Sequence, residues 1–74
     1  MVNFRFVTWN CAGGFAKKAP RLAGLHPDMV VCCEVKRTDA EALGSDWRFI
    51  WSGAPDQKGL LIAAKAPWTV NAVF

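Results

Sequence analysis

Residues 2–33, VNFRFVTWNCAGGFAKKAPRLAGLHPDMVVCC, decide the fold because a helix-like pattern lies between two strand-like patterns. Val2–Asn10 alternates along a β-branched and aromatic segment, which predicts a strand with apolar groups on both faces. Apolar residues then recur at helical spacing, and Pro20 fits the first turn of a helix that begins near Lys18. Met29–Cys33 is a continuous apolar run, typical of a strand buried on both faces. The segment therefore predicts a β-α-β unit.

The rest of the chain predicts a β-hairpin after this unit. Asp39–Leu43 favours a helical turn, Asp46–Ser52 a third strand, and Gly59–Lys65 a fourth strand antiparallel to the third because the link between them is short. Trp68–Phe74 also has the composition of a strand. We therefore expect one domain over residues 1–74, of the α/β (α+β) class, with a mixed sheet.

Composition excludes several classes of protein. A 74-residue chain buries only about 60 % of its unfolded surface, yet 53 % of this one is hydrophobic, with four Trp and five Phe. That is too apolar for a disordered chain, and no apolar run approaches the roughly 20 residues of a membrane span. No apolar leader follows Met1, so we expect neither a signal peptide nor a membrane partner. The net charge of +3 leaves a nucleic-acid partner open without predicting one.

The three cysteines do not form a disulfide framework. Their number is odd, and Cys32 and Cys33 are neighbours that point to opposite faces of a strand. This favours a reducing, cytoplasmic location. The same divergence argues against a zinc site built from these cysteines, Cys11 and His26. His26, the only histidine, is predicted at the opposite edge of the sheet from the strand ends, where it would have no catalytic role.

Two polar residues follow the apolar strands and form the candidate site. Asn10 follows Trp9, and Glu34 follows Cys33, so in a parallel pair both lie at the same edge of the sheet. An amide oxygen and a carboxylate are hard donors that suit Mg²⁺. The alternative is that Glu34 marks where the strand meets solvent, and that Asn10 caps the turn before Gly13 and Gly14.

These residues resemble the amino-terminal part of the endonuclease/exonuclease/phosphatase superfamily, whose fold is the deoxyribonuclease-like α/β sandwich. Three segments carry the resemblance: FVTWNCAGG at 6–14, PDMVVCCEV at 27–35 and KGLLI at 58–62. In the family, one strand ends in Trp-Asn and another, after Pro-Asp, ends in Gln-Glu. Cys33 stands where the family usually has Gln.

The resemblance implies that Asn10 and Glu34 help to bind a divalent metal, usually Mg²⁺. Family members cleave phosphate esters with a His base and an Asp, from later Asp-x-Asn and Ser-Asp-His motifs that nothing here matches. We therefore expect a truncated, hydrolase-like domain without catalytic residues of its own. A missing carboxy-terminal half would complete it.

The alternative function is a non-enzymatic module that self-associates into a homodimer or higher homo-oligomer. Three aromatic residues, Trp47, Phe49 and Trp51, share one face of the third strand. Together with either Phe4 and Phe6 or Val7 and Trp9, they are expected to form an inner face that the family covers with a second sheet. Left exposed, such a face favours a second copy as its cover.

Overall fold

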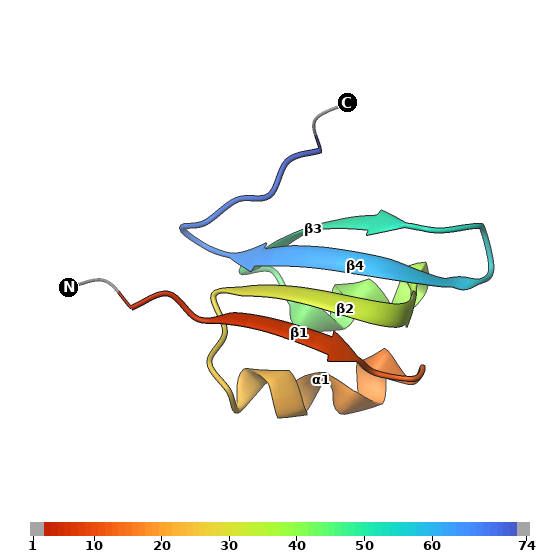
Figure 1. Cartoon of the computed structure of the whole chain (residues 1–74), viewed down its shortest axis with the longest axis horizontal. Coiled ribbons are helices and arrows are strands. Elements are labelled where there is room, and N and C mark those ends of the chain that lie inside the picture. Colours follow the sequence, from red (N-terminus) through yellow and green to blue (C-terminus); the bar gives the residue numbers. More distant parts are fainter. Residues whose placement is uncertain (1–2, 73–74) are drawn as a thin grey trace.

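The computed structural model describes residues 3–72, which form a mixed four-stranded sheet with both helices packed on one face (Figure 1). Along the chain the elements are β1 (Phe6–Asn10), α1 (Phe15–Ala23), β2 (Met29–Lys36), the 3₁₀ helix η1 (Arg37–Leu43), β3 (Trp47–Ser52) and β4 (Lys58–Lys65). Across the sheet the order is β1-β2-β4-β3. β1 and β2 are parallel, whereas β4 is antiparallel to both of its neighbours. The predicted α+β class is confirmed.

The β-α-β unit is present, and its strands are aligned at their starts by a polar contact. The parallel register runs from Phe6 opposite Met29 to Asn10 opposite Cys33. Just before it, the backbone N–H of Arg5 donates to Asp28 Oδ2 at 2.7 Å, and the N–H of Asp28 donates to the Arg5 carbonyl at 2.8 Å. β1 begins at Phe6 and is therefore shorter than the predicted strand, which began at Val2. Residues 3–5 are irregular, and residue 2 lies outside the described part.

The start of α1 was predicted wrongly. The helix begins at Phe15, so that Pro20 lies inside it rather than in its first turn. One helical hydrogen bond to the Ala16 carbonyl is lost, since proline has no N–H. Ala16 and Pro20 are both exposed, which leaves that side of the helix open to water. On the opposite side, Phe15 and Leu22 are buried, and their packing stabilises a helix that its sequence interrupts.

The predicted hairpin is confirmed, whereas the strand-like composition after residue 67 produces no strand in the described residues. β3 and β4 pair from Trp47 opposite Lys65 to Ser52 opposite Leu60, and η1 occupies the place of the expected helical turn. Residues 68–72 form no strand, while 73–74 lie outside the described residues. After β4 the chain leaves the sheet, and the Trp68 ring meets Phe4 edge to face with 4.9 Å between centroids.

The hydrophobic core lies between the sheet and the two helices. Phe15 and Leu22 of α1 and Ala40 of η1 pack there against buried residues of the central strands, Val30, Cys32, Val35, Leu61 and Ala63. Three aromatic residues of β3 that were expected to be exposed, Trp47, Phe49 and Trp51, pack against this core. Val7 and Trp9 of β1 pack against it as well. That expectation was wrong because the helices of this chain cover the aromatic face. Within residues 3–72, no helix has the length and apolar character needed to cross a membrane.

Candidate functional site

The parallel pairing of β1 and β2 brings Asn10 and Glu34 to the same edge of the sheet. Asn10 ends β1 opposite Cys33, the residue directly before Glu34. Cys11 ties the two strands together beyond this pair. Its thiol lies 3.3 Å from the Cys33 carbonyl and 3.4 Å from the Glu34 carbonyl, in position to donate to either. The two backbone positions are therefore adjacent, as the sequence predicted, and both residues are exposed.

Glu34 does not end its strand, which is a correction to the prediction. β2 continues to Lys36 and pairs with β4, and its register shifts between Cys32 and Val35. Glu34 lies in this β-bulge with a φ of 59°, a left-handed conformation that non-glycine residues rarely adopt. Bulges of this kind redirect a side chain at the margin of a sheet, often beside a functional site.

The Asn10 side chain caps the turn that follows β1. Its Oδ1 accepts a hydrogen bond of 3.0 Å from the Ala12 N–H, as the alternative interpretation of this residue predicted. An amide oxygen has two lone pairs, so this bond orients Oδ1 and leaves one lone pair free. The donor set of one carboxylate and one amide oxygen therefore fits Mg²⁺ chemically. Because both side chains are exposed, most of the ion's ligands would be water.

Two lysine side chains lie at the turn between β1 and α1, and the sequence pattern did not predict that they meet there. Ala12, Gly13 and Gly14 all have positive φ, and Lys18 donates to the Cys11 carbonyl. Lys58 lies over Gly13 so closely that a Cβ at this glycine would be 2.9 Å from its Nζ. These cations lie at the same edge as Asn10, because Lys58 begins β4 opposite Lys36 at the end of β2.

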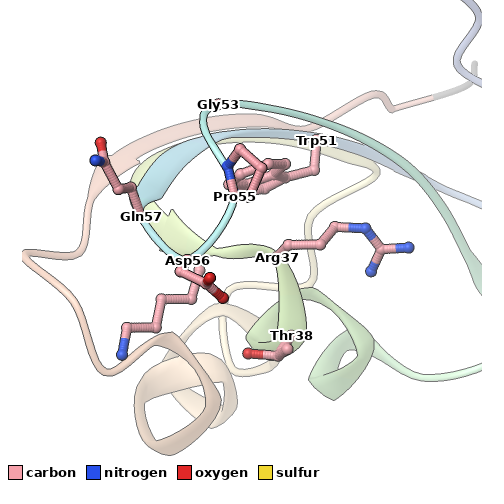
Figure 2. Close-up of a pocket in the computed structure, with 8 residues that line it drawn as sticks. Arg37, Thr38, Trp51, Gly53, Pro55, Asp56 and Gln57 are labelled. Carbon is pink, nitrogen blue, oxygen red and sulfur yellow. The ribbon is translucent and has the colours of Figure 1, made fainter.

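An open pocket of about 590 Å³ lies beside the end of β2, where Lys36, two residues after Glu34, is one of its lining residues (Figure 2). Trp51 and Pro55 form its apolar wall, and the polar lining comes from Lys36, Arg37, Thr38, Asp56 and Gln57. The indole of Trp51 is fixed by a 2.7 Å hydrogen bond from Nε1 to the Val35 carbonyl. The Arg37 guanidinium lies 4.9 Å from the centroid of the Phe49 ring, in a cation–π contact.

The cysteines and His26 lie where the sequence predicted. Cys32 is buried in the core and Cys33 is exposed, so their side chains diverge. Burial, together with the Cys11 and Cys33 thiols, raises the pKa of Cys32 to about 11. His26 follows α1 and precedes β2, at the opposite end of the parallel strands from Asn10. Among residues 3–72, no three His, Cys, Asp or Glu side chains gather into a metal-binding group.

Comparison of the chain with protein-family models, with curated proteins and with solved structures found no match in any of the three.

Proposed function

We propose that this chain is a phosphoesterase-like domain of the endonuclease/exonuclease/phosphatase type. It binds Mg²⁺ weakly through Asn10 and Glu34 and does not hydrolyse phosphate esters by itself. The observation that supports the proposal is the pairing of Asn10 with Cys33, because it brings the backbone of Asn10 next to Cys33, the residue directly before Glu34. The ion would lower the cost of negative charge on a bound phosphate group.

The surroundings of this edge support a phosphate-ester ligand. Lys18 and Lys58 lie at the turn after β1, and Lys36 lines the neighbouring pocket, so cations flank the two proposed metal ligands. Phosphate oxygens could complete the coordination of a Mg²⁺ ion held by a single carboxylate. The odd number of cysteines supports a reducing, cytoplasmic setting for this function.

The metal site is tested with Mn²⁺, which broadens the NMR signals of nearby nuclei, titrated into ¹⁵N-labelled chain. We expect the Asn10 side-chain amide signals to broaden first, with an affinity of about 10⁻³ M or weaker because only two protein ligands contribute. Glu34→Gln should abolish this broadening. Glu41→Gln is the matched control, since Glu41 is an exposed glutamate in η1. Equal broadening in the Glu34→Gln and Glu41→Gln variants would contradict the site.

Hydrolysis is tested on plasmid DNA and on nitrophenyl phosphate esters with Mg²⁺ or Mn²⁺. We expect no turnover above buffer, because a general base typically contributes about 10²–10⁴-fold and His26 is at the wrong end of the strands. We expect activity only when a separate carboxy-terminal half that carries the family's Ser-Asp-His motif is added to the chain. Turnover by the chain alone that Glu34→Ala removes would overturn the non-catalytic assignment.

A further inference from the structure

The face of the sheet opposite the helices has an apolar centre. We call it the open face: in Figure 1 no helix crosses in front of β2 and β4. The registers place its side chains in two rows that cross all four strands, Phe6-Met29-Ala64-Arg48 and Thr8-Val31-Ile62-Ile50. Beyond them lie the pairs Asn10-Cys33 and Leu60-Ser52, which are separated by the register shift between β2 and β4. Its six large apolar side chains are Phe6, Met29, Val31, Leu60, Ile62 and Ile50.

The polar residues of the open face lie at its margins. Arg48, Asn10 and Ser52 occupy three of its four corners, and Thr8 lies on the edge strand β1. An apolar centre inside a polar rim is the arrangement typical of protein–protein interfaces. The fourth corner, Phe6, is 52 % exposed. Two residues before it along the chain, Phe4 pairs with Trp68, and these two rings are 47 % and 43 % exposed.

We propose that a second copy of this chain covers the open face, in a symmetric dimer packed sheet to sheet. No charged residue is among the six large apolar side chains of the open face, so a two-fold axis near Val31 and Ile62 would bring apolar groups together without burying a charge. This inference does not depend on the metal site.

The available area is sufficient for such a dimer. Aromatic side chains bury about 150–250 Å² each, so the exposed parts of three rings offer roughly 90 Å² apiece. Leu60, which is 37 % exposed, and the partly buried Met29, Val31, Ile50 and Ile62 add to this area. Two copies would together bury on the order of 1,000 Å², which is the size at which specific interfaces begin.

The first test measures mass by sedimentation equilibrium between about 1 and 100 µM, the range in which mass action populates a modest dimer. We expect twice the 8.1 kDa of one chain at the upper end. Ile62→Glu should yield the single-chain mass with unchanged circular dichroism. Leu25→Glu is the matched control: Leu25 is 49 % exposed and follows α1 on the other side of the sheet, so this variant should remain a dimer.

The second test needs no variant, so it decides the matter even if Ile62→Glu fails to fold. Cys33 is the exposed thiol and lies on the open face, whereas Cys11 and Cys32 are buried. Its alkylation rate should fall about tenfold as the dimer forms. An alkylation rate independent of concentration would overturn the proposal. So would an 8.1 kDa species that melts cooperatively at 100 µM, which would show that the chain tolerates an exposed face or needs a different partner.

Discussion

Replacing Gly59 with alanine tests whether close packing of Trp51 stabilises the sheet and the wall of the pocket. A Cβ at this position would lie 2.2 Å from the Ser52 carbonyl oxygen and 2.8 Å from Cζ2 of Trp51. Both distances are shorter than any normal contact, so β3 must separate from β4 locally or the indole must move. Movement of the indole would also weaken its hydrogen bond to the Val35 carbonyl.

The expected cost follows from these contacts. Overpacking costs about 1–3 kcal/mol, and a lost hydrogen bond about 1 kcal/mol. The lower entropy of the unfolded alanine chain offsets about 0.4–1 kcal/mol. We therefore expect the free energy of unfolding to fall by about 2–3 kcal/mol, out of the roughly 4–11 kcal/mol typical of a chain this long. The melting temperature should fall by about 10–20 °C.

Urea unfolding followed by circular dichroism, at one protein concentration, measures this loss. Gly24→Ala is the control for loss of a glycine without overpacking, because Gly24 has a φ of −64° and the atom nearest to an added Cβ is 3.5 Å away. It should change the free energy of unfolding by less than about 1 kcal/mol. If Gly59→Ala costs no more than Gly24→Ala, the close packing of Trp51 does not stabilise the fold and this reasoning is refuted.

Two further predictions concern Cys32 and Asp28. Because the folded-state pKa of Cys32 is raised from 9.0 to about 11, stability should be full below pH 9 and lost as the pH rises toward 11. The loss, about 2–3 kcal/mol, should disappear in Cys32→Ala, and the same slope in that variant would contradict it. Asp28→Ala should cost about 1–2 kcal/mol through the lost Arg5 contact, and Asp28→Asn less, since it keeps an acceptor. Equal costs in thermal melts would refute that role.

Order and type of the elements could be predicted because the apolar patterns differ along the chain. The run at Met29–Cys33 and the alternation at Trp47, Phe49 and Trp51 each fit one kind of element. The start of α1 could not be predicted in this way. Local helix preference disfavours a proline beyond the first turn of a helix. In the folded chain, burial of Phe15 and Leu22 stabilises the helix by more than the loss of the single hydrogen bond at Pro20 destabilises it.

The sequence also could not predict which face of the sheet the helices cover. Apolar residues occupy both sides of β1, so alternation shows which residues share a face but not which face is covered. The packing of Val7 and Trp9 against the helices decides the question. The sequence could predict that Asn10 and Glu34 lie at the same edge, because the two strands were expected to be parallel. It could not predict the bulge at Glu34, because no residue preference predicts a glutamate with positive φ.

The place of β4 in the sheet determines when the domain can fold during synthesis. β4 is the last strand along the described chain, yet it lies between β2 and β3. A nascent chain that has emerged from the ribosome only as far as residue 57 contains three strands, but β3 has no neighbour with which to pair. Its aromatic residues then lack the strand that holds them over the core. Completion of the sheet is therefore a late, non-local event, which is the kind of topology that slows folding and prolongs exposure to aggregation.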